Sequence, residues 1–534
     1  MSRIVRDSQW GQSIVPPCSL KKGLDREFPR GQNREKDELP TMNQATIKKN
    51  SLRIRPAPKI GLVINSIGVF NPRSKDESEK AIREFVGRLA ASGEIDSGSI
   101  ITPRIFGPHE ALAAADQFAE ARVDLVVIAN VAFPNGQVFA TVATHPHLAR
   151  TPLAVVAEPE PAGPEWSTNA WCGVIMNNHV ARQIGRPIVT FPGPFTGDAF
   201  QAAFGRLLRV AGTIRFLRRD LLCRFGDAPS GFHSATGDQL AFAKVFGTRV
   251  ETVDLTAVME AYRSNKAQGY LGEVAFSEND VRATIVQMTE GRRVEVEPAM
   301  IERGARLYQA YRAIIRANGY TSAAFRCWPE NNELYIGISA CLAMGLLLAN
   351  GEITAAACES DWPTAVAQSI GTMLSGRPAA CLDWVDYTGG SEIIQLGHCG
   401  MGICGMMAPG ECRGAAGDAV AVHPVIRQGG GTVGPVHIGQ FEFGPKTGLC
   451  LARDPDGGFK LLAFRGESSP RTAQGKAYSA ADVHVPDYRK LNRLVLEGGF
   501  PHHLAVAMDD ITEEVRMLCT FLGVRYVSPH EAED

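Results

Sequence analysis

The chain has 534 residues, of which 45% are hydrophobic and 21% are charged, and its formal net charge is −2. This composition is typical of a soluble protein with about three domains, and the low net charge gives no sign of nucleic-acid or membrane binding. The 12 cysteines include no Cys-x-x-Cys pair and the first thirty residues hold no apolar leader. We therefore expect reduced thiols and a cytoplasmic location.

The first 57 residues differ from the rest of the chain. They contain 12 Lys or Arg and 6 Asp or Glu, few aliphatic residues and no hydrophobic periodicity. This pattern predicts a flexible extension, residues 1–57, and favours a solvated tail over a basic binding patch.

The pattern then changes to apolar strands that alternate with helices, which is typical of a parallel α/β sheet. We place a first α/β domain at residues 58–217. Its strands are expected at 59–65, 124–129, 151–157 and 188–191, with an amphipathic helix at 77–92.

A second α/β domain is predicted at residues 218–387, beginning with a strand at 221–224 and including a long helix at 298–318. Its last part reads strand–helix–strand–helix–strand, with strands at 321–328, 353–358 and 378–382. Because such crossovers are right-handed, we expect these three strands to be parallel, with their carboxyl ends at one edge. Beyond residue 387 glycine and proline become dense and strands short, which indicates a C-terminal antiparallel β domain or barrel at 388–534. The predicted fold class is thus two Rossmann-like parallel-sheet domains followed by a β domain.

An acidic residue follows each of those three strands, namely Glu330, Glu359 and Asp383. Helix capping accounts for Glu330, and for Asp361 just before a helix, but poorly for Asp383, because no helical pattern follows it. In open α/β sheets ligands bind at the carboxyl edge of the strands. We therefore expect Glu359 and Asp383 to share a site.

Two facing carboxylates repel unless a cation lies between them, which predicts a divalent metal with oxygen ligands. Nearby histidines would shift the preference from Mg²⁺ toward Mn²⁺, Co²⁺ or Zn²⁺. The candidates are His398 and the adjacent pair His502 and His503. Alone, each is more often a structural or surface histidine, and adjacent residues of a strand point in different directions, so at most one of the pair should ligate.

Several short blocks together resemble the L-fucose/L-arabinose isomerase superfamily, over most of the chain from about residue 59 to residue 508. The blocks are Cys-Arg-Phe-Gly-Asp at 223–227, Cys-Glu-Ser-Asp-Trp at 358–362, Leu-Asp-Trp at 382–384, Leu-Gly-His at 396–398 and Gly-Phe-Pro-His-His at 499–503. The Asp of Leu-Asp-Trp, Asp383, corresponds to the family's second acidic metal ligand, which is also Asp in fucose isomerases.

The resemblance implies a ketol isomerase that interconverts an aldose and a ketose through an enediol, with Mn²⁺ or another divalent cation as cofactor. Glu359 and Asp383 would serve as metal ligands and as the acid/base pair. His398 and one residue of the pair His502 and His503 would complete the ligands.

The resemblance also implies a homo-oligomer whose sites lie between subunits, with a sugar as the only partner. We expect Trp328 and Glu330 to line the pocket. Asn178 and His179 lie where the family's first domain contacts substrate, although the family's polar residues are not reproduced cleanly there.

Two alternatives remain open. The substrate of the isomerase is either an ordinary sugar or a sulfonated or phosphorylated one, for which Arg182, Arg186 and Arg326 are candidate anion ligands. A non-catalytic sugar-binding relative is the other alternative, disfavoured because a binding protein has no need of paired carboxylates. The chain has no Gly-x-Gly-x-x-Gly fingerprint after its first strand, so a dinucleotide cofactor is not expected.

Overall fold

The computed structural model describes residues 57–69, 72–164, 166–330, 336–387, 392–402, 406, 419–421, 427–428, 431–470 and 479–531. Apart from Ala57, the extension predicted for residues 1–57 lies outside these ranges.

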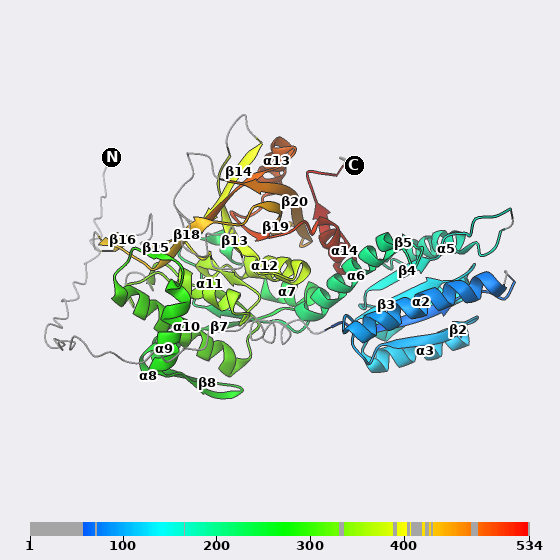
Figure 1. Ribbon diagram of the computed structural model, residues 1–534, viewed down its shortest axis with the longest axis horizontal. Helices are drawn as coiled ribbons and strands as arrows, with labels where there is room; N and C mark the ends of the chain where they lie inside the picture. The colour runs from blue at the N-terminus through cyan, green and yellow to red at the C-terminus, as the bar shows by residue number, and fades with distance from the viewer. Residues whose placement is uncertain are drawn as a thin grey trace, which may run out of the picture. The chain divides into compact units, whose positions relative to one another are not determined.

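The N-terminal sheet has five parallel strands in the order β2-β1-β3-β4-β5. The strands are β1 (Ile60–Asn65), β2 (Ile100–Ile105), β3 (Leu125–Asn130), β4 (Leu153–Ala157) and β5 (Val189–Pro192). Helices α2 (Pro72–Ser92) and α6 (Asp198–Leu217) pack on one face. The other face carries α3 (Pro108–Ala121), α4 (Gly136–Thr144) and α5 (Ala170–Gln183). Figure 1 shows α2 and α3 beside the strands of this sheet. Successive residues of β1 alternate between the two cores, so both faces of the sheet are apolar.

The central sheet has four parallel strands in the order β12-β11-β6-β7. They are β6 (Leu221–Phe225), β7 (Arg249–Val253), β11 (Ser322–Phe325) and β12 (Ala356–Ala357). Its helices are α7 (Gln239–Val245), α8 (Leu255–Ser264), α9 (Glu278–Thr289), α10 (Pro298–Asn318), α11 (Cys341–Ala349) and α12 (Trp362–Ser375), and a hairpin is formed by β8 (Lys266–Gly269) and β9 (Gly272–Ala275). Helix α12 begins with Pro363 in its first turn and ends at Gly376, whose φ of 76° lies in the left-handed region that glycine adopts easily.

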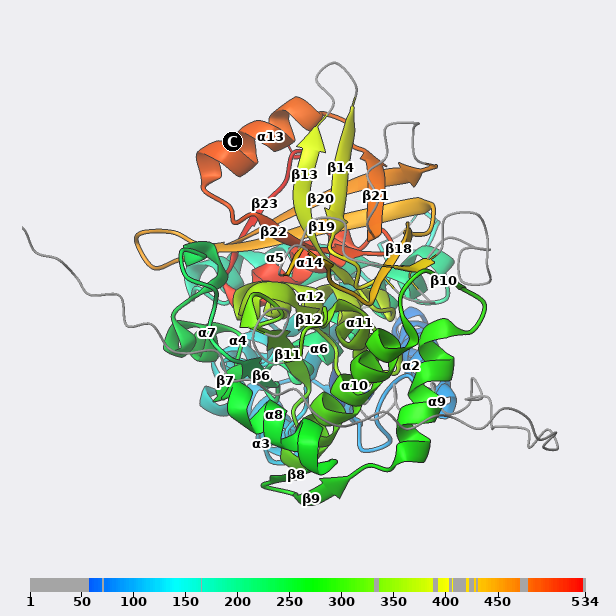
Figure 2. The ribbon, with the colours of Figure 1, turned by 90° about the vertical axis from the view of Figure 1, so that its left-hand side faces the viewer.

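The C-terminal part contains a closed barrel of six antiparallel strands. Around the barrel they follow the order β14 (Ile393–His398), β13 (Ala380–Tyr387), β22 (His503–Ala507), β19 (Gly444–Arg453), β20 (Phe459–Ser469) and β21 (Ser479–His484). Figure 2 shows β13 beside β14 and the other barrel strands around them. Strands β18 (Val436–Gln440), β15 (Ala419–Ala421) and β10 (Arg293–Val294) extend the sheet from β21, and β23 (Arg525–Val527) extends it from β20. Two short strands, β16 (Arg427–Gln428) and β17 (Gly431–Thr432), form a separate pair, and two helices, α13 (Tyr488–Gly498) and α14 (Thr512–Leu522), complete this part. The predicted fold class is confirmed.

One part of the predicted topology is wrong. The strand expected at 378–382 does not join the central sheet in parallel with β11 and β12. It becomes β13, which pairs antiparallel with β22 through its first half and with β14 through its second half. Asp383 therefore lies within a barrel strand and not past the end of a parallel one. A two-residue β12 offers little edge for a further strand, whereas β22 and β14 offer longer partners.

The central sheet and the barrel share one hydrophobic core, which contains residues of both, such as Phe325 and Val506. This shared core fixes the carboxyl edge of the central sheet against the barrel strands. Among the described residues, no helix is both long enough and apolar enough to cross a membrane.

Asp220, just before β6, gives a stability test of the central sheet. Its side chain is fully buried, and its Oδ1 accepts hydrogen bonds from Thr321 Oγ1 at 2.8 Å and Ser322 Oγ at 2.7 Å. Burial outweighs these bonds and raises the pKa of Asp220 to about 6. Because the folded pKa exceeds the unfolded one, this carboxyl favours folding at acidic pH. That contribution is lost as the pH rises from about 4 to about 6.

We predict that Asp220→Asn becomes more stable relative to the native chain across this range, by up to about 3 kcal/mol, since one pKa unit corresponds to about 1.4 kcal/mol. Unfolding temperatures of both proteins measured from pH 4 to pH 8 check this. The exposed Asp456 in the turn after β19 provides the control, Asp456→Asn. Parallel pH profiles for native and Asp220→Asn proteins would contradict the prediction.

Candidate metal centre

Three neighbouring barrel strands bring together an aspartate and two histidines. Asp383 in β13 lies directly opposite His503, the first residue of β22. On its other side Asp383 lies opposite Gly397, which precedes His398 at the end of β14. Directly paired residues of antiparallel strands project from the same face, so the pairing places Asp383 and His503 side by side.

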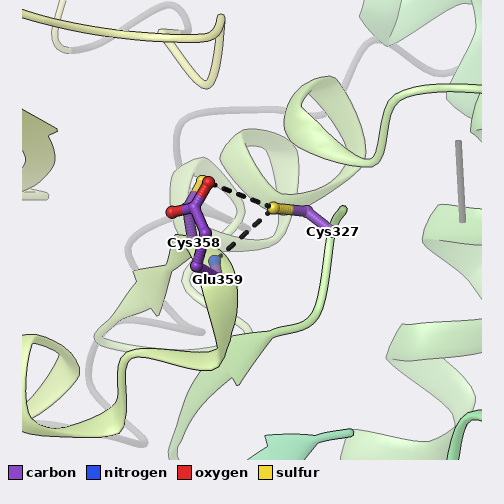
Figure 3. Close-up of side chains that lie close together, drawn as sticks. All are labelled: Cys327, Cys358 and Glu359. Atoms are coloured by element: carbon purple, nitrogen blue, oxygen red, sulfur yellow. Dashed lines mark hydrogen bonds between the residues drawn. The ribbon is translucent and has the colours of Figure 1, made fainter. Parts of the chain in front are cut away.

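Glu359 comes from the central sheet, in the turn Cys358–Ser360 that follows β12 (Figure 3). Glu359 and Ser360 both have left-handed backbone angles, with φ of 49° and 57°, which non-glycine residues rarely adopt. The turn is held by the Glu359 amide, which donates to Cys327 Sγ at 3.5 Å, and by Ser360 Oγ, which donates to the Gly226 carbonyl at 2.8 Å. Backbone strain of this kind concentrates at functional sites, and here it aims the Glu359 carboxylate at the barrel.

The four side chains converge on one point. His503 Nε2 lies 3.1 Å from Glu359 Oε2 and 3.4 Å from Asp383 Oδ1. His398 Nε2 lies 3.6 Å from Glu359 Oε2, 3.8 Å from Asp383 Oδ2 and 3.4 Å from His503 Nε2. Both imidazoles are buried, as is Glu359, whereas the Asp383 side chain is 38% exposed. The cluster is therefore open to solvent on the Asp383 side.

Asp361 fixes the orientation of His503. Its Oδ2 lies 2.8 Å from His503 Nδ1. The same carboxylate caps α12, because it accepts hydrogen bonds from the backbone amide and the hydroxyl of Thr364. An ionised carboxylate at Nδ1 keeps the ring proton there and leaves the Nε2 lone pair directed at Glu359 and Asp383. This is the arrangement of a metal-ligating histidine.

His502 is placed differently from His503. Its Nδ1 lies 2.9 Å from Ser234 Oγ, and its ring is tilted by 33° against that of His503, with centroids 4.0 Å apart. A ligand atom of His502 does lie within 4.8 Å of ligand atoms of Asp383 and His503. Because only His503 has a buried carboxylate behind it, the geometry favours His503 as the ligand of the pair.

His398 has a different proton arrangement. The backbone amide of Cys399 donates to His398 Nδ1 at 2.8 Å, so the neutral ring carries its proton on Nε2. In that form Nε2 donates toward the two carboxylates and has no lone pair for a metal. The expectation that His398 ligates stays a prediction, and its local hydrogen bond favours a donor role.

The charges in the cluster are strongly coupled. Burial would raise the pKa of Glu359, but the imidazoles of His398 and His503 lower it well below its usual range. Burial would lower the pKa of His503, but the neighbouring Cys381, Asp361 and Glu359 raise it well above its usual value. Carboxylates at a buried site are stable only beside positive charge, and a divalent cation can supply that charge.

The residues present fit such a cation. Glu359 Oε2 is buried, and the Nε2 atoms of His398 and His503 both lie within 3.6 Å of it. Nitrogen and oxygen donors that gather this closely are typical of ligands that face a common ion. The ligand atoms of Glu359, His398 and His503 all lie within 4.8 Å of one another. The set of buried nitrogen and carboxylate donors suits a first-row divalent metal but does not identify it.

Of the two residues predicted to line the pocket, Glu330 is held in an ion pair and Trp328 lies near His502. Glu330 forms an ion pair with Arg326 and so is not free to bind a sugar as it stands. The Trp328 ring lies 6.0 Å from that of Phe232, which in turn lies 5.9 Å from the His502 ring. Phe232 and Ser234, in the loop after β6, were missed by the sequence reasoning, because neither has a charged or metal-binding side chain to mark it.

The candidate residues of the N-terminal sheet lie on and just after α5. Asn178 and Arg182 line a cavity of about 500 Å³. Arg186 donates to the carbonyls of Leu148 and Thr151, which marks it as a structural residue. Asn178 Nδ2 likewise donates within its own helix, to the Val174 carbonyl. A role for Asn178 and His179 in a neighbouring subunit's site stays a prediction.

Comparison with known proteins adds independent evidence. No family model matches the chain. The sulfoquinovose isomerase of Clostridium sp. (strain MSTE9) is 28% identical over 407 residues, which cover 74% of this chain and 84% of that enzyme. The sulfoquinovose isomerase of Alkalicoccus urumqiensis is 28% identical over 401 residues, which cover 74% of this chain and 83% of that enzyme.

The matched region spans most of the chain, whose described residues contain two α/β sheets, a six-stranded barrel and a buried cluster of acidic and histidine side chains. On this evidence the chain is similar to aldose–ketose isomerases, in agreement with its resemblance to the fucose/arabinose isomerase-like superfamily.

Proposed function

We propose that this chain is a metal-dependent aldose–ketose isomerase whose substrate is a sulfonated sugar. The observation that carries the proposal is the position of His503 Nε2, which lies 3.1 Å from Glu359 Oε2 and 3.4 Å from Asp383 Oδ1. Asp361 forms a hydrogen bond with the other nitrogen of the same ring. A sugar-binding protein without catalysis has no need for such a set of donors.

Glu359, Asp383 and His503 would hold the cation, with manganese as our first candidate. When bound there, a divalent cation polarises adjacent carbonyl and hydroxyl oxygens and so stabilises negative charge that develops on them. His398, with its Nε2 proton directed at the same point, would donate a hydrogen bond to a carboxylate or to a sugar oxygen.

The remaining chemistry is proton transfer by the two carboxylates. The C2–H bond of the open-chain aldose breaks, its proton passes to one carboxylate, and O1 gains a proton to give a cis-enediol. The O2 hydroxyl then loses its proton and C1 gains one, which gives the ketose. The lowered pKa of Glu359 keeps this side chain in the carboxylate form at neutral pH, the form that holds a cation.

We predict that Glu359→Gln and Asp383→Asn fold but lose turnover by at least about 10²–10⁴-fold, the usual contribution of an acid/base group. The measurement is ketose formation with Mn²⁺ present. Asp386→Asn is the matched control, since Asp386 lies on the same strand as Asp383 and its side chain is exposed. Near-native rates for Glu359→Gln would refute the assignment.

The two adjacent histidines give a second prediction. His503→Gln should weaken Mn²⁺ binding by more than the roughly 10–100-fold that loss of an outer-sphere partner costs, because it removes a ligand. His502→Gln should leave Mn²⁺ affinity nearly unchanged, because its ring bonds Ser234. Calorimetric titration of the metal-free proteins measures both affinities. The opposite ranking would assign the ligand to His502.

A sulfonated substrate is supported by the two relatives and by basic residues at the same sheet edge. Arg224 at the end of β6 lies in register with Ala324 in β11, which lies in register with Ala357, two residues before Glu359. Two strand spacings place Arg224 about 10 Å from Ala357 across the sheet. Arg326 follows β11, two residues beyond Ala324. Burial, and then the charge of Arg326, lower the pKa of Arg224.

Arg224 has capacity to bind an anion. It contacts Asp227, but its Nε is buried and has no hydrogen-bond partner among the described residues. Guanidinium groups of this kind recognise the oxygens of sulfonate or phosphate groups. Arg326, by contrast, is engaged by Glu330 and by the carbonyls of Asp227 and Ala228.

We predict that the enzyme converts sulfoquinovose faster than glucose or fucose at equal concentration, and that Arg224→Met lowers kcat/KM for the sulfonated sugar by about 10–100-fold. That range corresponds to loss of one hydrogen bond to a charged group. Turnover of a neutral aldose by Arg224→Met should stay close to that of the native enzyme. Equal losses on both sugars would show that Arg224 has a structural role only, and a preference for glucose or fucose would exclude the sulfonated substrate.

A further inference from the structure

Buried cysteines contact the Glu359 carboxylate through Oε1, whereas the histidines lie nearest to Oε2. Cys327 follows β11 and Cys358 follows β12, two adjacent parallel strands of the central sheet. The two sulfur atoms and a Glu359 carboxylate oxygen all lie within 4.8 Å of one another. In Figure 3 the Cys327 sulfur points at both the Glu359 carboxylate and its backbone nitrogen, at 4.0 Å from Oε1 and 3.5 Å from the nitrogen.

Two more thiols adjoin this pair. Hydrogen bonds with Cys327 and Cys341, together with burial, raise the pKa of the Cys358 thiol well above its usual value. A hydrogen bond with Cys341 and burial likewise raise the pKa of Cys399. Four of the nine cysteines among the described residues thus gather at one place, from four different segments of the chain.

Simple core packing does not account for this arrangement. A buried cysteine normally behaves as a small apolar residue and needs no charged neighbour. Here a carboxylate oxygen faces the thiols within a space closed to solvent, since Cys327, Cys341 and Cys358 are at most 5% exposed. Two ligands of a single tetrahedral zinc lie roughly 3.5–4 Å apart, given metal–sulfur and metal–oxygen bonds of about 2.3 and 2.1 Å. The 4.0 Å between Cys327 Sγ and Glu359 Oε1 is close to this spacing.

We propose that Cys327, Cys358 and Glu359 form a second cation site that takes a thiophilic divalent ion of the zinc class. Each ligating thiol releases its proton to solvent on binding. Glu359 is then shared between two sites, with Oε1 on the sulfur side and Oε2 on the histidine side.

The sharing of Glu359 between two sites has a consequence for activity, and this consequence rests on the proposed function. An ion held by the thiols would draw the Glu359 carboxylate toward sulfur and neutralise its charge. The carboxylate would then be lost to proton transfer, and Zn²⁺ would inhibit the Mn²⁺-loaded enzyme without competing with the sugar. The site itself does not depend on the isomerase assignment.

The test uses Cd²⁺ as the probe, because a thiolate bound to Cd²⁺ absorbs in the ultraviolet by charge transfer. The full chain is loaded with Mn²⁺ and titrated with Cd²⁺. We expect a saturable thiolate band for the native protein and for Cys519→Ser, which alters a buried cysteine of α14 elsewhere in the fold. We expect loss of the band in Cys327→Ser and in Cys358→Ser. Absence of the band in the native protein, or its persistence in both variants, would overturn the proposal.

Two further measurements keep the outcome decisive. Cadmium NMR of the native protein reports sulfur ligation directly, so the proposal stays testable if a serine variant fails to fold. Zn²⁺ inhibition of isomerisation, scored against each variant's own basal rate, should disappear in Cys327→Ser and persist in Cys519→Ser. Zn²⁺ inhibition unchanged in Cys327→Ser would overturn the sharing of Glu359. A protein that binds Cd²⁺ through sulfur yet isomerises no sugar would keep the site and reject the proposed function.

Discussion

The hydrogen bond between Asp361 and His503 joins the two halves of the candidate centre. Asp361 begins α12 of the central domain, and His503 begins a strand of the barrel, 142 residues later. The carboxylate both caps the helix and holds the Nδ1 proton of the imidazole. Because an N-cap carboxylate is already fixed by the helix it caps, it positions the histidine without further ordering. The orientation of the His503 ring thus depends on α12, a helix of the central domain.

The positions of Asp383 and Glu359 also depend on the contact between the central domain and the barrel. The antiparallel register between β13 and β22 places Asp383 beside His503, so once His503 is oriented, Asp383 lies within reach of the same point. Glu359 reaches that point from the opposite side, by a left-handed turn that its cysteine and serine neighbours hold in place. A carboxylate that is 8% exposed and a second that is 38% exposed then face one histidine nitrogen. The two carboxylates therefore differ in their access to solvent.

The sequence predicted the fold class and most element positions, because strands and helices of the two α/β sheets have strong periodic patterns. It brought Glu359 and Asp383 together for a reason that is partly wrong. The strand carrying Asp383 does not extend the parallel sheet, and long-range pairing with β22, more than a hundred residues away, cannot be read from local pattern. The choice between His502 and His503 also depended on that register and on the carboxylate of Asp361, which the sequence suggested only as a helix cap.

The cysteines escaped prediction for a related reason. Cys327, Cys341, Cys358 and Cys399 have no short metal-binding spacing, because each lies at the end of a different strand or at the start of a helix. They meet only when β11, β12 and β14 have all folded around Glu359. One glutamate then separates a face of nitrogen and oxygen donors from a face of sulfur donors. Since nitrogen and oxygen donors suit manganese, whereas thiolates favour softer ions, the two faces would select different metals while they compete for the same carboxylate. The strained turn at Glu359 is what places that carboxylate between them.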